Sequence, residues 1–302
     1  MILPTIEVEV EKVARHYNEG DEFYREVWGE HVHHGLWETG KESPEAAVVN
    51  LTHKVATHAD IQPGMKVCDV GCGYGGTSRL LVSEYGAQVT GLTVSEAQYH
   101  YAIAQTPGQD NPQFRLCPWE DNDFESESFN VVVSIECISH VRDKAEFYRQ
   151  IYRVLRPGGK AVVIAWLANA ESGRMAQRHL LQPICTEGRL PGMATADEYR
   201  QMISDAGLTC DGYEEMGRKV RKTWWICARR MVWNLCTRLK YIKELFKRGG
   251  NREFVVTLFR ILIAYHTGSM QYGLFQISKP PNSFTENAGQ TSSENSLKAV
   301  ST

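Results

Sequence analysis

A short apolar run that ends in closely spaced glycines is the feature that most constrains how this chain folds. The run 67–70 leads into Gly71, Gly73 and Gly75, and residues 77–85 then have the pattern of a helix. Glycine permits backbone conformations that a side chain would forbid, and it lets a ligand approach the main chain at a helix N-terminus. The stretch predicts a buried strand that turns sharply into a helix beside a nucleotide-like cofactor; a tight turn without a ligand is the alternative.

The glycine pattern alone is weak evidence for one particular cofactor. The dinucleotide-binding fingerprint reads G-x-G-x-x-G and has an acidic residue about 20 positions later. Here the pattern is Gly71-x-Gly73-x-Gly75, followed directly by Gly76, and Asp69 precedes the turn. The turn by itself therefore indicates a cofactor site of a general kind.

Strand and helix patterns alternate from Met65 onward. Strands are expected at 66–70, 88–92, 113–116, 130–135 and 161–166, helices at 77–85, 95–105 and 143–155, and two further strands near 208–216 and over 270–278. The alternation predicts an α/β fold with a Rossmann-like sheet of seven mostly parallel strands, whose ligands lie outside the carboxyl ends of the strands.

The remaining segments divide the chain. The expected divisions are a helical N-terminal segment at 1–60, a core at 61–278 with an irregular polar insertion at 167–194 and a helical one at 226–266, and a tail at 279–302. The tail has too little apolar content to fold, so we expect it to be disordered.

Composition excludes several classes of protein. The net charge of −3 over 302 residues does not suggest a nucleic-acid partner. Eight scattered cysteines without a CxxC pair fit a reducing compartment, and Glu7 and Glu9 stand where an export signal would be basic or apolar. We therefore expect a cytoplasmic protein. We expect no metal, because His33 and His34 lack a supporting set of ligands.

Further motifs point to a family. The chain carries V-x-D-V-G-x-G-x-G-G from Val67, G-L-T-V-S-x-x-Q from Gly91, S-I-E from Ser134 with His140, and L-R-P-G-G from Leu155. Together these resemble the class I S-adenosylmethionine-dependent methyltransferases over residues 10–278. The segments H-Y-N at 16–18, W-G at 28–29 and H-H-G at 33–35 are similar to the branch that holds tocopherol and sterol C-methyltransferases.

This resemblance implies S-adenosylmethionine as the cofactor. The residues it assigns to the cofactor are Asp69, Gly71, Gly73 and Gly75 at the turn beside the methionyl part, Thr93 and Gln98 at the ribose, Trp119 and Glu120 at the adenine, and Ser134 near the methionyl carboxylate. Thr93 stands where the wider family usually has an acidic residue, a variant found in this branch. For Trp119, a surface role in covering a strand end is the alternative.

The resemblance places the chemistry after the fourth strand. Methyl transfer from a sulfonium is an in-line displacement, so the protein must chiefly align the acceptor and exclude water. His140 is the expected base, or else it caps the helix that starts near Arg142. Glu136 would stabilise a cationic intermediate, hold the imidazole, or form a plain salt bridge. Ser139 replaces the glutamate that cyclopropane-forming relatives carry before this histidine, which argues against cyclopropanation.

Aromatic residues near the N-terminus indicate the acceptor site. In relatives this segment folds over the cofactor as a lid, and aromatic faces attract cations such as a sulfonium. We expect Tyr17 to contact the cofactor or the acceptor and to take part in catalysis. The residues expected to contact the acceptor are Tyr24, Trp28, His33, His34 and Trp166. Core packing is the alternative for most of these rings.

A basic, amphipathic stretch covers residues 218–248. Within it Met231, Val232 and Leu235 begin an apolar face at helical spacing. We interpret the stretch as a cap helix over the acceptor pocket, or as a surface that also contacts an anionic membrane. No recognition motif accompanies the charge, so nucleic acid is disfavoured.

The residues together predict a methyltransferase that acts on a small, lipophilic acceptor. On the resemblance, C-methylation of an isoprenoid-bearing or aromatic natural product is the preferred hypothesis. N- or O-methylation of an alkaloid or phenolic compound is the alternative, and a non-catalytic, cofactor-binding regulatory protein is the third. The oligomeric state is left open.

Overall fold

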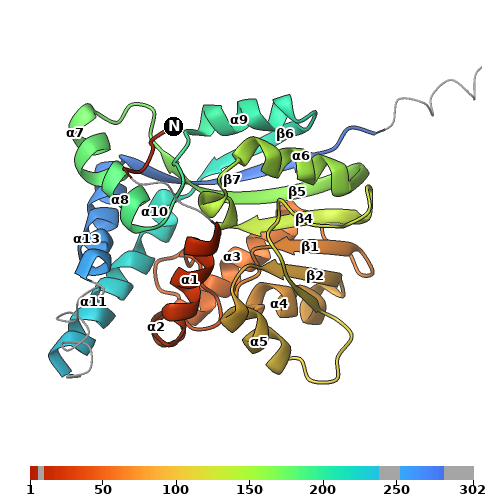
Figure 1. Cartoon of the computed structure of the whole chain (residues 1–302), viewed down its shortest axis with the longest axis horizontal. Coiled ribbons are helices and arrows are strands. Elements are labelled where there is room, and N and C mark those ends of the chain that lie inside the picture. The colour runs from red at the N-terminus through yellow and green to blue at the C-terminus, as the bar shows by residue number, and fades with distance from the viewer. Residues whose placement is uncertain (6–9, 238–251, 282–302) are drawn as a thin grey trace, which may run out of the picture.

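One mostly parallel sheet forms the centre of the protein, described by a computed structural model for residues 1–5, 10–237 and 252–281. Within these residues the sheet has seven strands in the order β3-β2-β1-β4-β5-β7-β6 (Figure 1). The strands are β1 (Lys66–Val70), β2 (Gln88–Thr93), β3 (Gln113–Leu116), β4 (Phe129–Ile135), β5 (Leu155–Ala168), β6 (Thr209–Glu215) and β7 (Met270–Ser278). β1 to β5 pair in parallel, and β7 runs antiparallel between β5 and β6. The expected α/β fold is confirmed.

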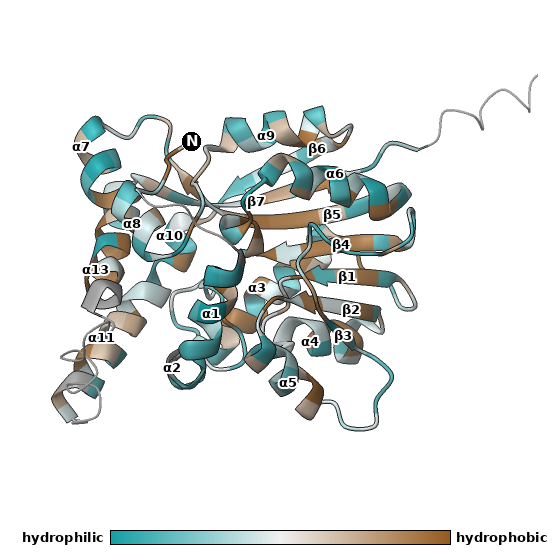
Figure 2. Cartoon of the chain, viewed as in Figure 1, coloured by the Kyte–Doolittle hydropathy of each residue, from teal (hydrophilic) through white to brown (hydrophobic). Residues whose placement is uncertain are grey.

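Helices cover both faces of the sheet because its central strands are apolar on each side. The helices of the core are α3 (Pro44–His58), α4 (Gly76–Tyr85), α5 (Glu96–Ala104), α6 (Lys144–Val154) and α9 (Ala196–Asp205). On β4, Val131 and Val133 pack in a cluster with α3 and α4, whereas Val132 packs in a second cluster with α6 and α9. Strands buried on both faces form continuous apolar runs, which appear brown in Figure 2.

Two short helices, α1 and α2, lie over the carboxyl ends of the central strands (Figure 1). Their bounds are Val10–Glu19 and Asp21–Val27. The Asn18 side-chain oxygen accepts a hydrogen bond from the Ser95 hydroxyl at 2.7 Å, at the start of α5. The Tyr74 hydroxyl donates to Asp21 at 2.8 Å, next to the glycine turn. Both helices are therefore hydrogen-bonded to the loops that follow β1 and β2.

A second group of helices flanks the same end of the sheet. It comprises α7 (Arg174–Ala176), a π-helical turn (Gln177–Leu181), α8 (Gln182–Glu187), α10 (Gly217–Val220), α11 (Lys222–Thr237) and α13 (Arg252–Thr267). Residues 174–187 are helical where irregular chain was expected. Leu181, Ile184 and Cys185 are fully buried in a core cluster that also contains residues of α13. These apolar residues are too few to show a helical period in the sequence, which is why helices were not expected here.

The buried face of α11 differs from the expected one. Trp224, Cys227, Ala228 and Met231 are buried, whereas Val232 is 49% exposed. The buried stripe follows the 3.6-residue period from Trp224, and Val232 lies about a quarter turn from its centre, at the border with the exposed face. The remainder of the expected face, from residue 238 onward, lies outside the described residues.

Order extends past the expected start of the tail. Lys279 is buried, and its Nζ donates to the Leu155 carbonyl at 2.8 Å. Its main chain also exchanges hydrogen bonds with Gly158 and Gly159. Disorder was expected from residue 279 onward, but Lys279 is ordered because its main chain pairs with residues 158 and 159. Residues 282–302, for which disorder was also expected, lie outside the described residues.

Candidate active site

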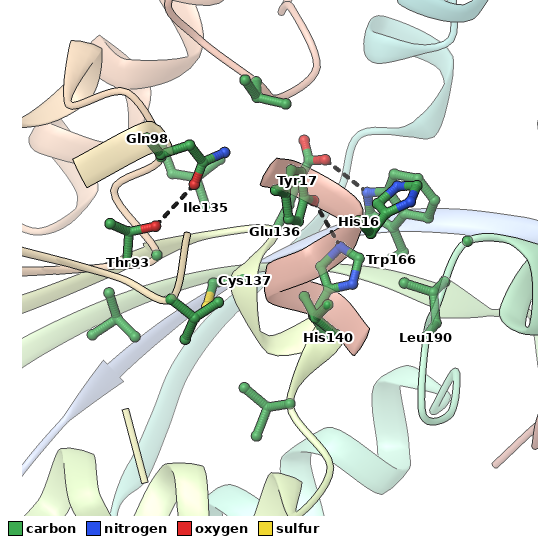
Figure 3. Close-up of a pocket in the computed structure, with 18 of the residues that line it drawn as sticks. His16, Tyr17, Thr93, Gln98, Ile135, Glu136, Cys137, His140, Trp166 and Leu190 are labelled. Atoms are coloured by element: carbon green, nitrogen blue, oxygen red, sulfur yellow. Dashed lines mark hydrogen bonds between the residues drawn. The ribbon is translucent and has the colours of Figure 1, made fainter. Parts of the chain in front are cut away.

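A deep cavity opens at the carboxyl ends of β1, β2 and β4, below α1 and α2 (Figure 3). Of the residues predicted for cofactor, catalysis or acceptor, those that line it are Tyr17, Tyr24, Trp28, His34, Gly71, Gly73, Thr93, Gln98, Trp119, Glu120, Glu136, His140 and Trp166. The structure thus brings most of the predicted site residues to one place, although they come from segments far apart in the sequence.

The glycine turn forms one wall of this cavity. A β-carbon on Gly71 would lie 2.4 Å from the Cys137 β-carbon, and one on Gly75 would meet the Phe114 ring. A β-carbon on Gly73 would meet no protein atom within 4 Å, although Gly73 lines the cavity. Gly71 and Gly75 therefore serve the packing of the turn, and Gly73 keeps space open on the cavity side.

Asp69 supports the turn from behind. It is 2% exposed and accepts a hydrogen bond from the Ser78 hydroxyl at 2.6 Å, in the first turns of α4. Burial raises the pKa of this carboxyl to about 6, against the lowering effect of Ser78. Asp69 thus ties the end of β1 to α4.

The polar pair after β2 faces the cavity. The Thr93 hydroxyl donates to Gln98 Oε1 at 2.9 Å, which leaves the Gln98 amide nitrogen as a donor (Figure 3). Ser95 caps α5 by accepting from the Gln98 main-chain N–H. Trp119 is 3% exposed, with its indole N–H donating to the Phe147 carbonyl at 3.1 Å, so the ring is fixed at the cavity edge.

Four predicted site residues lie outside this cavity. Asp69 and Gly75 do not line the cavity, and His33 lines a separate groove between residues 25–37 and α11. Ser134 is fully buried within β4, and its hydroxyl has no hydrogen-bond partner. Among the described residues no group of three or more His, Cys, Asp or Glu side chains could hold a metal ion.

Tyr17 and His140 form a hydrogen-bonded pair inside the cavity. His140 Nδ1 lies 3.2 Å from the Arg189 carbonyl oxygen, which can only accept, so Nδ1 carries the hydrogen. Nε2 then accepts from the Tyr17 hydroxyl at 3.1 Å (Figure 3). Burial lowers the pKa of His140 to about 4, and Lys144 contributes to this lowering. The imidazole is therefore a neutral base whose lone pair points at Tyr17.

Glu136 carries a buried carboxylate with four donors. Oε1 accepts from the His34 main-chain N–H at 2.7 Å, from His34 Nδ1 at 2.8 Å and from the Tyr272 hydroxyl at 2.6 Å. Oε2 accepts from the Trp166 indole N–H at 2.9 Å (Figure 3). Burial alone would raise the pKa of this carboxyl, but the interactions with His34 outweigh it and lower the pKa to about 2. Glu136 is thus ionised and holds the imidazole of His34, not that of His140.

Aromatic rings enclose this charge. Tyr24 packs against Tyr17 and Trp28, with ring centroids 5.2 and 5.6 Å apart, and Trp28 packs against Trp224 at 5.9 Å. Trp166 in turn contacts Trp224 at 5.6 Å. The carboxylate therefore lies beside a group of aromatic rings that line one part of the cavity.

Comparison with known proteins places the chain. Residues 5–250 match the family described as mycolic acid cyclopropane synthetase. The chain belongs to this family. It is 27% identical over 290 residues to the chloroplastic tocopherol O-methyltransferase of Arabidopsis thaliana, an alignment that covers 89% of this chain and 82% of that protein. It is 32% identical over 207 residues to the sterol 24-C-methyltransferase ERG6B of Gibberella zeae, which covers 67% and 54%.

A solved structure agrees with the fold. Mycolic acid cyclopropane synthase CmaA1, in complex with SAH and CTAB, has a TM-score of 0.80 at 20% identity, over 91% of this chain and 99% of that chain. The expected family and its tocopherol and sterol branch are confirmed, and the protein is an S-adenosylmethionine-dependent methyltransferase.

The cavity residues fit S-adenosylmethionine. Gly73, which was expected beside the methionyl part, leaves open space on the cavity side, and Gln98, which was expected at the ribose, keeps its amide nitrogen as a donor. Trp119 and Glu120 line the cavity together, and burial raises the pKa of Glu120.

Sequence reasoning missed several residues of the site. Tyr272 on β7 binds Glu136 directly, Trp224 on α11 lines the cavity, and Tyr265 on α13 lies 3.3 Å from His34 Nε2. Tyr265 and Tyr272 stand in apolar helix and strand patterns and therefore looked like core. Trp224 belongs to the basic stretch 218–248, which was interpreted as a cap over the acceptor pocket but not as part of the site. The one sequence signal that could have found them is the polar group of each side chain. A buried tyrosine or tryptophan needs a hydrogen-bond partner for its O–H or N–H, and here that partner belongs to the site.

Proposed function

We propose that this methyltransferase C-methylates a lipophilic acceptor, an isoprenoid-bearing or aromatic small molecule. An ionised carboxylate beside aromatic rings in the cavity supports this most strongly. S-adenosylmethionine supplies, when bound, an electrophilic methyl group on a sulfonium. Methylation of an alkene or ring carbon leaves a positive charge on the acceptor and then requires loss of a proton. The site must therefore stabilise a cation and supply a base.

Glu136 is suited to stabilising a cation. A carboxylate whose pKa is near 2 has little affinity for a proton at neutral pH, so it keeps its charge instead of acting as a base. Its donors hold it in one orientation, which lowers the cost of reorganisation as charge develops. The faces of Tyr17, Trp28 and Trp166 add further attraction for a cation.

His140 is suited to removing the proton. A base is most effective when its pKa is matched to its task, and the His140 pKa of about 4 makes it a weak base. A carbocation loses a neighbouring proton readily, so a weak base suffices, whereas a phenol holds its proton with a pKa of about 10. This contrast favours C-methylation over O-methylation. The proton reaches Nε2 directly or through the Tyr17 hydroxyl.

N-methylation is the second candidate. Transfer of a methyl group to an amine also leaves a cation, which the Glu136 carboxylate would stabilise equally well. Methyl-labelled cofactor, a metabolite extract and mass spectrometry of the product distinguish the two. A new carbon-bound methyl group is the expected result, and a methyl group on nitrogen or oxygen would overturn the proposal.

The role of Glu136 can be tested without knowing the acceptor. Sinefungin carries a carbon in place of the cofactor's sulfur and a protonated amine in place of its transferable methyl group, whereas S-adenosylhomocysteine carries a neutral sulfur. In Glu136→Gln we expect the affinity for sinefungin to fall about tenfold relative to S-adenosylhomocysteine, measured by calorimetry. The matched control is Glu120→Gln, at the adenine side, which should weaken both ligands together. An unchanged ratio in Glu136→Gln would refute the proposed role.

We further propose that α11 and α13 contact an anionic membrane surface, from which such an acceptor would enter. Trp225, Val232 and Trp233 are 63%, 49% and 68% exposed on one face of α11, with exposed Arg229 among them. On α13, Phe259 is 46% exposed. Figure 2 shows these helices at the edge of the molecule. Exposed tryptophans beside basic residues are typical of interfacial helices.

No helix of the described residues has the length and apolarity to span a bilayer.

Liposome flotation tests this surface. We expect recovery with phosphatidylglycerol vesicles to exceed that with phosphatidylcholine vesicles, and to fall in the double variant Trp225→Ser, Trp233→Ser. Ile103→Ser is the control, because Ile103 is 43% exposed on α5, away from α11. Equal recovery of the double variant and the control would remove the membrane contact.

A further inference from the structure

His34 was expected to contact the acceptor, but the protein itself uses every polar group of this residue. The main-chain N–H and Nδ1 both bind Glu136 Oε1. Nε2 lies within hydrogen-bond distance of Trp224 Nε1 and, at 3.3 Å, of the Tyr265 hydroxyl. The residue is 1% exposed. No donor or acceptor of His34 is left for a substrate.

The partners of His34 fix where its hydrogen lies. An indole N–H can only donate, so Nε2 must accept the hydrogen bond from Trp224. The hydrogen of the ring is therefore on Nδ1, directed at Glu136 Oε1 at 2.8 Å. The tryptophan selects the tautomer in which the imidazole donates to the carboxylate.

Glu136 needs such support because its backbone is strained. It has φ = +66°, a left-handed conformation that residues with side chains rarely adopt. Strained residues of this kind persist where the surrounding structure determines their conformation. Here the support comes from β5 through Trp166, from β7 through Tyr272 and from the loop between α2 and α3 through His34. Two of the four donors belong to His34 alone.

We propose that His34 is a positioning residue, whose Nδ1–H orients the Glu136 carboxylate toward the reacting groups while Trp224 holds the tautomer that makes this possible. This role of His34 rests on the proposed function of Glu136, because His34 acts only by orienting that carboxylate. It also couples the cap helices to the chemistry, because α11 and α13 supply the groups that face Nε2.

Two substitutions of His34 separate this role from simple packing. Asparagine places its amide nitrogen near the position of Nδ1, so His34→Asn keeps the donor to Glu136 and loses the contacts of Nε2. Glutamine reaches the position of Nε2, so His34→Gln keeps the contacts with the cap and the main-chain N–H, and loses only the side-chain donor to Glu136. Both replace the ring by an amide.

The readout is the ratio of sinefungin to S-adenosylhomocysteine affinity, measured by calorimetry. We expect His34→Asn to stay within about twofold of the wild-type ratio. His34→Gln keeps the carboxylate charge, so it should lower the ratio by less than Glu136→Gln does, about fivefold, with S-adenosylhomocysteine binding similar in both. Once labelled transfer has identified the acceptor, His34→Gln should lower kcat and leave KM little changed. Equal ratios in the two variants, or a lower ratio in His34→Asn, would overturn the proposal.

Two further variants distinguish failure of the positioning role from failure of the proposed function. Trp224→Phe leaves the imidazole in place but removes the donor to Nε2, so we expect a smaller fall in the ratio than in His34→Gln; no fall would refute the tautomer argument. If Glu136→Gln itself leaves the ratio unchanged, the proposed function of the carboxylate fails. If Glu136→Gln lowers the ratio and neither His34 variant does, only the positioning role fails.

Discussion

Buried neutral His140 should make the stability of the protein depend on pH. Its pKa is lowered to about 4 in the folded protein from 6.5 in a model peptide, chiefly by burial. The unfolded chain therefore binds more protons between these two values, and stability falls as the pH falls from about 6.5 to about 4. For pKa values of 6.5 and about 4, lowering the pH from about 7.5 to about 5 costs about 2 kcal/mol at this one residue.

Urea unfolding followed by tryptophan fluorescence, at these two pH values, measures that cost. The wild-type protein should lose more than about 2 kcal/mol, because burial also lowers the pKa of His16 to about 4 and of His31 to about 3. His140→Gln keeps a side chain able to meet Tyr17 and does not titrate in this range. The loss of stability should shrink by about 2 kcal/mol in this variant. An equal loss in both proteins would show that His140 is not a buried neutral base.

The glycine turn and the lid give two further predictions. Gly71→Ala should lower the melting temperature more than Gly73→Ala, because its new β-carbon would overlap the Cys137 side chain. Gly73→Ala should instead weaken S-adenosylhomocysteine binding in calorimetry, since its β-carbon would enter the cavity; equal affinity to wild type would contradict this. Asn18→Ala removes the acceptor for Ser95 and should speed dissociation of S-adenosylhomocysteine severalfold in stopped flow, with unfolding in urea changed by about 1 kcal/mol or less.

The predictable part of the fold was local. Continuous apolar runs predict buried parallel strands, and the sheet has each of them at the expected place, with ends shifted by few residues except in β5, which begins at Leu155 and not at 161. Glycine turns and caps such as Ser43 before Pro44 are readable because their effect depends on neighbouring residues. Residues 174–187 were missed because their helicity depends on contacts with α13, a segment far along the chain.

The candidate site was predictable as a set of residues but not as a set of contacts. The motifs place Glu136 and His140 after β4, yet nothing local says which imidazole the carboxylate binds. His34 takes that position because the loop before α3 passes over the end of β4, a consequence of tertiary packing. Ser134 shows the opposite error, since alternation along β4 directs its side chain into the core and away from the cavity.

The position of β7 sets the order in which the protein is completed. This strand comes last in the sheet by sequence but lies between β5 and β6, where Lys160 pairs with Ser278 and Thr209 pairs with the same residue. β6 joins the sheet by pairing with β7, so it cannot join before β7 has been synthesised. Until then, the edge of β5 that pairs with β7 stays unpaired. Such distant pairings are slow to form and leave unpaired strand edges exposed meanwhile. Because Tyr272 arrives with β7, Glu136 acquires its last donor only in this final step, and a nascent chain that lacks β7 has no finished active site.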